Sequence, residues 1–491
     1  MQKAFKPGLI ATSVAAAMLS LMSQQVYATN GYAAHGFGSL QKAMGGTAVA
    51  GSDDAMNMAT NPAAMSFGKN NWTAGIDIFV PDRGASYKGT PAAPGIPAGA
   101  PLGGGLSLAG PLPATPALPG ADLRGNDDSN FVIPEFAYQR HLNNKFAVGI
   151  AVYGNGGMNA TYDKSIFGPR FNRDGSPINP DFSPGGSDTG IDFAQLFIAP
   201  SISMKVNDRN SIGASLNLAY QRIKINGVGG FAPFSSSPTN LSNNGYDDST
   251  GAGITVGWQT KLTDSLTAGL AYRSETKMSK FDKYKGLLAE QGDFDIPSMV
   301  TGGISYKATP KTTIALDIAH INYTDVKAIS NKNNTAPLLG QLLGGVPPQN
   351  FQGPKLGDDE GAGFGWKDTT AFKFGVKHQL NNKMALLAGY NHGKAPIGED
   401  QTAFNILAPA TVEDHLTLGL DWKLSTSSKV VVSYMHAFSN TIKGDGSRGP
   451  TGAFNAPGAI INNGPNPLTN ATAADIEMSQ DSIAVAYSKD F

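Results

Sequence analysis

The sequence predicts an all-β protein, a 14-stranded antiparallel transmembrane β-barrel with a small N-terminal plug in its lumen. Three observations lead to this fold class. The N-terminus is typical of exported proteins, apolar residues alternate with small or polar ones, and short connections alternate with long ones. We expect a signal peptide over 1–28, a plug or hatch over 29–70, and a barrel with long extracellular loops over 71–491.

The first residues resemble a secretory signal peptide. Lys3 and Lys6 give a positive start, a weakly polar run follows, and small or branched residues at Val26 and Ala28 suit cleavage after Ala28. The alternative is a transmembrane helix, but the apolar run is too short to cross a bilayer comfortably. The sequence therefore predicts export.

The composition narrows the class further. The chain contains no cysteine, so disulfides and thiolate chemistry are excluded. Its net charge of −1 gives no reason to expect a nucleic-acid partner. Charged residues make up 15% of the chain, against roughly 25% in soluble domains. A cysteine-free, glycine-rich exported chain of low charge fits a barrel in the cell outer membrane.

Alternation with a period of two residues marks the expected strands. Leu416, Leu418 and Trp422 share one face of a strand, whereas Thr417 and Asp421 share the other. A membrane barrel needs this pattern, with apolar residues toward lipid and small or polar ones inside. The sequence holds fourteen such segments: 71–80, 131–141, 145–153, 193–206, 211–226, 252–261, 265–276, 299–307, 312–323, 371–380, 384–392, 414–422, 429–437 and 481–491.

The connections between these strands alternate strictly in length. Tight turns made of typical turn residues join every second pair of strands. The other connections are long: 81–130, 154–192, 227–251, 277–298, 324–370, 393–413 and 438–480. This asymmetry is typical of periplasmic turns and extracellular loops.

Lipopolysaccharide and other outer-membrane lipids are the expected surroundings of such a barrel. A closed barrel leaves no strand edge that requires a second copy, so we expect a monomer.

The last residue, Phe491, lies on the apolar face of the last expected strand. A terminal aromatic residue in this place resembles the signal read by the barrel assembly machinery, which is therefore an expected partner. The alternative is that the strand simply ends there.

The segment before the first strand, 29–70, resembles part of a known protein family. Small residues and short helix-forming pieces dominate it, which favours a packed plug over a disordered tail. It contains the run HGFGSLQKAMGGTAVAGSDDAMNMATNPAAMSF. This run resembles the N-terminal hatch of the FadL/TodX family of outer-membrane channels. Two later stretches also resemble that family: IPSMVTGGISYKATPKTTIALDIAHINYTDV and WKDTTAFKFGVKHQLNNKMALLAGYNHGKAPI. The Pro- and Gly-rich stretch 89–120 departs from the family pattern.

The resemblance implies passive uptake of long-chain fatty acids or related hydrophobic compounds. It further implies capture between outer loops, gating by the hatch, and sideways exit at a kinked third strand. Phe37 and the Asn61-Pro62-Ala63 motif are the implied gating residues. Gly154, Asn155, Gly156 and Gly157 could supply the kink, because glycine permits bulges, or could simply end the strand.

Two loops carry apolar residues at helical spacing that could capture ligand or merely pack the loops together. These residues are Phe281, Tyr284, Leu287, Leu288, Leu338, Leu339, Leu342 and Leu343. Inside the barrel, Arg273, Lys373 and Lys377 could meet a carboxylate head group. The alternative is that Glu135, Asp317 and Asp421 balance these charges.

Enzymatic function has little support. No GxSxG or HExxH motif is present, the histidines lack metal-ligand spacing, and no cofactor or metal is expected. Acidic clusters in the outer loops could bind Ca²⁺, but solvated charge is the commoner explanation.

Two further functions stay open beside a hydrophobic channel. One is a general porin for small polar solutes, and the other is a surface adhesin or phage receptor.

Overall fold

The computed structural model describes residues 30–87, 99, 101–103, 106–107, 121–125, 130–162, 188–333, 336–445 and 474–491. The predicted signal peptide and most of the stretch 89–120 lie outside these ranges.

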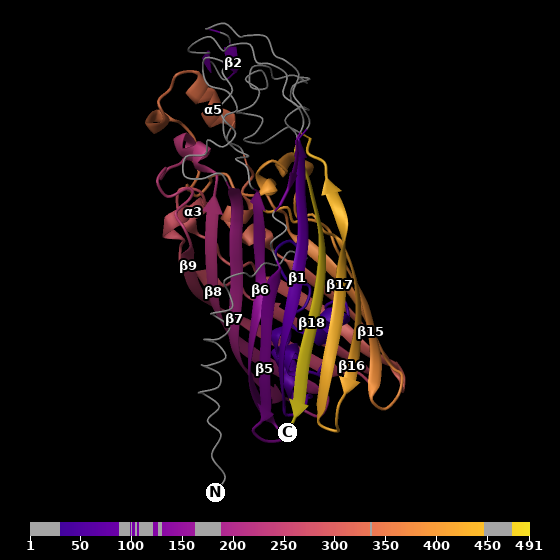
Figure 1. Ribbon diagram of the computed structural model, residues 1–491. Coiled ribbons are helices and arrows are strands. Elements are labelled where there is room, and N and C mark those ends of the chain that lie inside the picture. Colours follow the sequence, from indigo (N-terminus) through magenta and orange to yellow (C-terminus); the bar gives the residue numbers. More distant parts are fainter. Residues whose placement is uncertain are drawn as a thin grey trace.

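Fourteen antiparallel strands form one closed wall (Figure 1). They are β1 (Asn71–Tyr87), β5 (Phe131–His141), β6 (Phe146–Tyr162), β7 (Thr189–Lys205), β8 (Asn210–Asn226), β9 (Asp247–Lys261), β10 (Leu266–Arg273), β12 (Met299–Thr309), β13 (Thr312–Ile321), β14 (Thr369–Gln379), β15 (Met384–Gly393), β16 (Asp414–Lys423), β17 (Ser428–Ile442) and β18 (Ala474–Asp490).

Each wall strand pairs with its neighbours along the chain, and the first strand closes on the last. Pairing of β1 with β18 runs from Asn71 opposite Asp490 to Tyr87 opposite Ala474. Pairing therefore runs around the whole wall and closes the barrel, as a spanning structure requires. The predicted 14-stranded antiparallel barrel is therefore confirmed.

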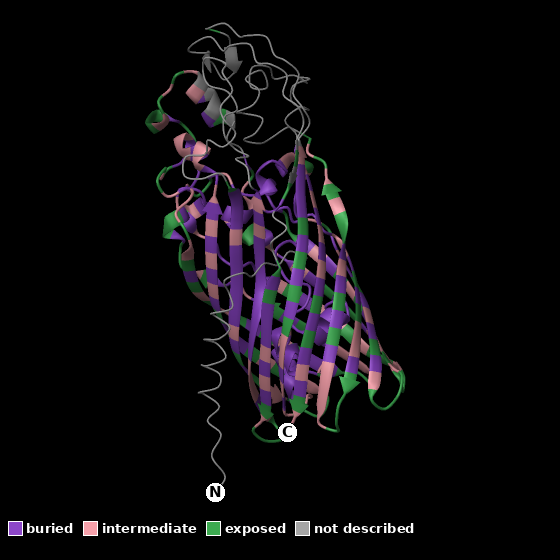
Figure 2. Ribbon diagram, viewed as in Figure 1, coloured by how far each residue is buried: buried purple, intermediate pink, exposed green. Residues whose placement is uncertain are grey.

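Burial alternates along the strands as the membrane requires (Figure 2). In β16, Leu416, Leu418 and Trp422 are exposed on the outside, whereas His415 and Thr417 are fully buried. Several strands extend beyond their predicted ends at the side of the long loops. There the outward residues change from apolar to polar, as at Asp475 and Glu477 in β18, so the alternating pattern no longer marks the strand.

The hatch lies inside the lumen, toward the end of the barrel that carries the short turns (Figure 1). It contains helix α2 (Ser39–Ala43) and the 3-10 helices η2 (Ala55–Ala59) and η3 (Pro62–Ser66), and their residues are all buried. The side chains of Asp54 and Asn61 cap η2 and η3 by accepting hydrogen bonds from the backbone N–H groups of Met56 and Ala63.

Short elements decorate the loops at the opposite end. The small strands are β2 (Pro101–Gly103), β3 (Leu106–Ser107), β4 (Ala121–Arg124) and β11 (Lys277–Met278). The helical turns are η4 (Gly229–Phe234), η5 (Asp282–Tyr284), α3 (Ala289–Gly292), η6 (Tyr323–Asp325), α4 (Lys327–Ser330), α5 (Ala336–Leu343), η7 (Pro348–Asn350), η8 (Glu399–Gln401) and η9 (Phe404–Ile406). Within the described ranges, no helix has the length and hydrophobicity needed to span a membrane.

Candidate ligand path from the outer loops to the hatch

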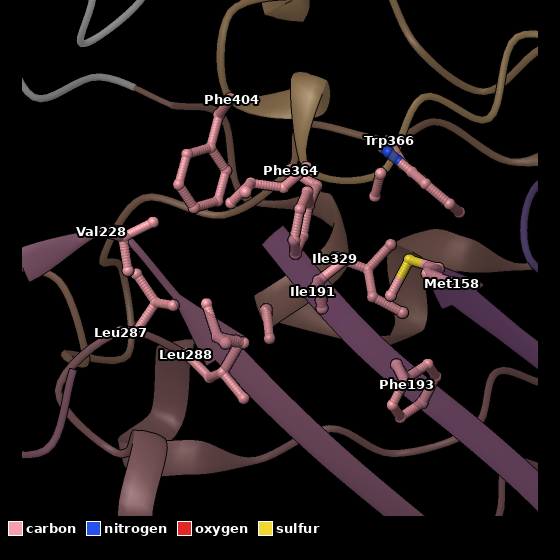
Figure 3. Close-up of a cluster of buried hydrophobic side chains, with 14 of the residues drawn as sticks. Met158, Ile191, Phe193, Val228, Leu287, Leu288, Ile329, Phe364, Trp366 and Phe404 are labelled. Atoms are coloured by element: carbon pink, nitrogen blue, oxygen red, sulfur yellow. The ribbon is translucent and has the colours of Figure 1, made fainter. Parts of the chain in front are cut away.

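A large apolar cluster joins the outer loops to the upper barrel (Figure 3). Loop residues Leu287 and Leu288 lie in it beside Ile191 and Phe193 of β7 and Met158 of β6. We call this set the outer cluster, and its other large members are Tyr32, Tyr162, Ile223, Ile225, Val228, Phe231, Phe234, Leu241, Phe281, Tyr284, Phe294, Ile321, Tyr323, Val326, Ile329, Leu338, Phe351, Leu356, Phe364, Trp366, Ile397, Phe404, Ile406, Leu407 and Ile476.

The residues predicted to form a capture site behave differently from one another. Phe281, Tyr284, Leu287 and Leu288 are all nearly inaccessible and belong to the outer cluster. In α5, Leu338 is buried in the cluster and Leu342 packs against it. The side chains of the remaining two predicted residues in α5, Leu339 and Leu343, lie outside the described part of the chain. The two loops therefore share one apolar core.

A buried hydrogen-bond network fixes the loops around this core. The Trp366 indole N–H donates to Asn405 Oδ1 at 2.6 Å. The Asn405 amide donates in turn to the carbonyl oxygens of Phe364 and Gln401, both at 2.7 Å. Because Trp366 and Phe364 follow β13 while Asn405 follows β15, one asparagine ties two separate loops together.

Aromatic rings continue from the outer cluster to the hatch. We call these rings, together with those of Phe37, Tyr153 and Phe197 described below, the aromatic path. Tyr32 of the hatch lies with its ring centroid 5.3 Å from that of Tyr323 and 5.9 Å from those of Phe193 and Trp366. The Tyr323 hydroxyl donates to the Asn30 carbonyl at 2.5 Å. Burial raises the pKa values of Tyr32 and Tyr323 above the usual range, so both phenols stay neutral.

A second aromatic group lies beside α2. Phe37, predicted to take part in gating, has its ring centroid 4.6 Å from that of Tyr153, and Tyr153 makes an edge contact with Phe197 at 5.6 Å. These three rings belong to a separate buried cluster that also includes the hatch methionines Met56 and Met58. The hatch thus presents aromatic and thioether surface to the inner wall.

The wall has a defect between these two groups of rings. The register of β6 with β7 shifts between Gly154 and Gly156, which is a β-bulge at Asn155. Pairing of β5 with β6 stops at Glu135 opposite Tyr153, although β6 continues to Tyr162. The glycine segment therefore does not end the third strand. It lies within the strand, where the neighbour on one side is missing.

The hatch occupies the edge of β6 left free by β5. The Ala34 N–H donates to the Asn155 carbonyl, and the Gly157 N–H donates to the Tyr32 carbonyl, both at 3.2 Å. A Cβ atom on Gly156 would lie 2.4 Å from the Tyr32 carbonyl oxygen, so glycine permits this close approach. Hatch and bulge are therefore held by the same hydrogen bonds.

Three buried polar side chains meet at the bulge. Arg273, the last residue of β10, donates from a terminal guanidinium nitrogen to Asn155 Oδ1 at 2.5 Å. The Asn155 amide donates to Gln195 Oε1 of β7 at 2.7 Å. The Arg273 guanidinium carbon lies 5.5 Å from the ring centroid of Phe197. Two residues predicted for different roles, Asn155 and Arg273, are thus brought into direct contact.

The two predicted lysines lie elsewhere and have protein partners. Lys373 Nζ donates to the His35 carbonyl at 2.9 Å and so holds the hatch. Lys377 Nζ is 2.8 Å from Asp421 and 3.5 Å from Asp53 of the hatch. Both lysines therefore anchor the plug in this conformation, and of the three predicted basic residues only Arg273 adjoins the aromatic path.

The Asn61-Pro62-Ala63 motif fixes the hatch to the wall formed by β8 and β9. Asn61 Nδ2 donates to the Val49 carbonyl at 2.7 Å and to the Trp258 carbonyl of β9 at 3.1 Å. The Ser211 hydroxyl of β8 donates to the Ala63 carbonyl at 3.0 Å. The motif is thus a structural joint between plug and barrel, fully buried at Asn61 and Ala63.

Two cavities open beside the hatch near the short turns. The larger has a volume of about 820 Å³, and the smaller about 370 Å³. Both are lined by Ser52, Asp53, Phe67 and Lys377. Charged and polar side chains are interspersed with apolar ones in both linings, so the two cavities differ in character from the aromatic path above.

Sequence reasoning missed Tyr32, Tyr153 and Gln195. Each follows an ordinary sequence pattern, since aromatic and amide residues are common in barrel strands and plugs. These three residues come close to one another only because the hatch, β6 and β7 meet in the folded protein.

The comparisons with known proteins agree with this architecture. Residues 19–457 match the family model described as outer membrane protein transport protein (OMPP1/FadL/TodX). No curated protein matches the chain. Among solved structures, the toluene transporter TodX of P. putida is 16% identical, with a TM-score of 0.59 over 93% of this chain and 99% of that one. A FadL homologue of Pseudomonas aeruginosa is 15% identical, with a TM-score of 0.59 over 94% of this chain and 100% of that one. The Ralstonia pickettii toluene transporter TbuX is 16% identical, with a TM-score of 0.56 over 93% of this chain and 99% of that one.

At these identities the solved structures support the fold, while the family model covers most of the sequence. The chain therefore belongs to the OMPP1/FadL/TodX family of outer-membrane transport proteins, as a channel for hydrophobic compounds and not an enzyme.

Proposed function

We propose that this protein carries long-chain fatty acids, or related hydrophobic compounds, passively across the outer membrane. The observation that carries the proposal is the run of apolar and aromatic side chains from the outer loops through Tyr32 to the β6 bulge, with the buried cation of Arg273 beside it. Ligand would enter through the outer cluster, pass the hatch, and leave sideways at the bulge.

The chemistry of the path suits an apolar chain better than a polar solute. Each buried CH₂ group favours apolar surroundings by about 0.8 kcal/mol, so a fatty acid gains little from a water-filled pore. The buried side chains of the hatch also occupy the lumen that a general porin would keep open. This packing weighs against the porin alternative.

Sideways exit is supported by the missing strand pairing. Above Glu135 and Tyr153 the β5–β6 ladder stops, and the hatch residues Tyr32 and Ala34 bond to the free edge. A hydrophobic molecule that leaves here would enter the membrane without crossing water. In this proposal Gly154, Asn155, Gly156 and Gly157 form the opening.

Neutral aromatic hydrocarbons are a second substrate candidate. Two of the similar solved proteins are toluene transporters, and the rings around Tyr32 would suit a flat apolar ligand. Arg273 favours the fatty acid, because a carboxylate can form charge-assisted hydrogen bonds that a hydrocarbon cannot. Outer-membrane lipids, including lipopolysaccharide, and the barrel assembly machinery are further proposed partners, and the barrel is proposed to act as a monomer.

Uptake of labelled oleate by a strain that lacks its own long-chain fatty-acid channel tests the proposal. The wild type is compared with an Asn61→Ala/Pro62→Ala variant, and heat-dependent gel mobility checks barrel assembly. We expect uptake with the wild type and its loss in the assembled variant. Labelled toluene is tested in parallel; uptake of toluene without oleate would favour the second candidate.

The adhesin or phage-receptor alternative is tested separately. Deletion of 89–120 should leave oleate uptake intact if that stretch serves surface partners. If wild-type protein carries neither ligand yet the deletion abolishes cell adhesion or phage adsorption, the transport proposal is wrong.

A further inference from the structure

We propose that Arg273 couples the head group of an anionic ligand to the β6 bulge. In this mechanism a carboxylate replaces Asn155 as the partner of the guanidinium, and the bulge is released. The inference rests on the proposed function and adds how the substrate class could control sideways exit.

The first support is the reach of Arg273 across the lumen. In the barrel, β7, β8 and β9 separate β10 from β6, so these two strands share no backbone hydrogen bonds. Nevertheless the Arg273 guanidinium contacts Asn155 Oδ1 at 2.5 Å. A single side chain therefore links two distant parts of the wall at the height of the defect.

The second support is the charge state of this contact. Arg273 is 4% exposed, and no carboxylate lies within 4.0 Å of it among the residues that the structure describes. Its Nε also has no partner among them. An uncompensated buried cation is costly, and Asn155 offers only a neutral acceptor. A carboxylate can accept two parallel hydrogen bonds from a guanidinium and neutralise it, so the exchange is favourable.

The third support is the position of Asn155. Its backbone carbonyl accepts the Ala34 N–H of the hatch at 3.2 Å, and its side chain joins Arg273 to Gln195. It is the residue displaced by the register shift between Gly154 and Gly156. Loss of the Arg273 contact therefore weakens the bulge at the point where hatch and wall meet.

The mechanism predicts discrimination by head group. Oleate would compete with Asn155 for Arg273, whereas oleyl alcohol has the same chain length but no charge. Both would still bind the outer cluster through their apolar chains. The coupling would thus act on release and not on capture.

Spin labels across the defect test this coupling in the full-length protein. The chain contains no cysteine, so Val132→Cys on β5 and Thr161→Cys on β6 would carry the only labels. Both side chains are at least partly exposed. The distance between labels is measured without ligand, with oleate and with oleyl alcohol, and bound ligand is quantified in the same samples.

We expect oleate, but not oleyl alcohol, to lengthen the distance distribution. Arg273→Met should show the lengthened distribution without ligand, no response to oleate, and oleate affinity reduced roughly tenfold or more. Asn155→Asp should keep the short distribution even with oleate, because its own carboxylate then pairs with Arg273. Lys311→Met, in an exposed turn, serves as the matched control and should behave as wild type.

Equal responses to oleate and oleyl alcohol would overturn the coupling, as would an Arg273→Met protein that still responds to oleate. Binding of oleate by the wild type without any change in distance would also overturn it and leave the proposed transport standing. Absence of oleate binding by correctly assembled wild type would remove the coupling together with the fatty-acid proposal. Arg273→Lys provides a second variant if Arg273→Met fails to assemble.

Discussion

Asn61 of the hatch lies against Gly257 of β9 so closely that a Cβ atom on the glycine would be 2.0 Å from Asn61 Oδ1. The same asparagine caps η3 and donates to the Trp258 carbonyl. The wall is therefore shaped for the hatch at this point, and the fit depends on a residue without a side chain.

Gly257→Ala should push the hatch from its seat without unfolding the barrel. A Cβ at 2.0 Å from another atom forces a shift of the backbone or of Asn61, which breaks the contacts to Val49 and Trp258. We expect ion conductance in planar bilayers to rise. Gly302→Ala is the control, because its Cβ would meet only Leu270 at 3.6 Å. Equal conductance of both variants would argue against this seat.

Lys42→Met should loosen the hatch through an unpaired buried carboxylate. Lys42 Nζ lies 2.5 Å from Asp77 of β1, and both side chains are almost fully buried. Breaking such a pair costs about 3–5 kcal/mol, whereas replacing both partners costs much less. We expect maleimide labelling of an Ala43→Cys reporter to accelerate roughly 100-fold or more. The Lys42→Met/Asp77→Leu double variant should label nearly as slowly as wild type; fast labelling of the double would contradict this explanation.

Acidification should strengthen the loop that carries Leu287 and Leu288. Burial, assisted by nearby Asp295, raises the pKa of Asp293 to about 6. The folded loop then binds this proton more tightly than the unfolded chain, so ionisation destabilises the loop above pH 6. Stability should rise as the pH falls from about 7 toward about 4. Hydrogen exchange, corrected for intrinsic rates, should show slower opening of 281–288 at pH 5 than at pH 7.5.

Asp293→Asn supplies the control for the pH effect. Without an ionisable group at this position, the difference in protection between the two pH values should shrink, and protection at pH 7.5 should increase. Since Asp293 is only partly buried, the expected effect is about 1 kcal/mol. A pH dependence that persists unchanged in the variant would assign it to another group.

Trp366→Phe should destabilise the outer loops while sparing the barrel. Phenylalanine fills most of the volume but leaves Asn405 Oδ1 without the indole donor. Loss of one partner in a buried hydrogen bond costs about 1–3 kcal/mol. Proteolysis between β13 and β14 should then begin at lower urea concentration. Trp258→Phe, on the exposed outer face, should not change that threshold.

Alternation and connection length were sufficient to place all fourteen strands, because lipid outside and a filled lumen inside impose opposite demands on successive residues. They failed at the upper strand ends, where β6 continues to Tyr162 past its predicted end at 153. Past Tyr153, contacts with the hatch and the loops bury the side chains on both faces of β6, so the period of two residues loses its apolar marker.

The candidate site was less accessible to sequence reasoning. Helical spacing singled out Phe281, Tyr284, Leu287 and Leu288 as candidate capture residues, and the structure packs them together in one core. Lys373 and Lys377 carry the same charge as Arg273, so sequence alone could not distinguish cations that hold the hatch from one that faces the aromatic path.

The sequence by itself determined the barrel, its strand number, the sides on which turns and loops lie, and the presence of a plug-like segment. These properties follow from local patterns that the membrane enforces residue by residue. Only the tertiary structure decided that Asn155 meets Arg273, that Ala34 bonds to the free edge of β6, and that Gly257 receives Asn61. Such contacts depend on the closure of the barrel, which brings together residues separated by more than a hundred positions and leaves no periodic trace in the chain.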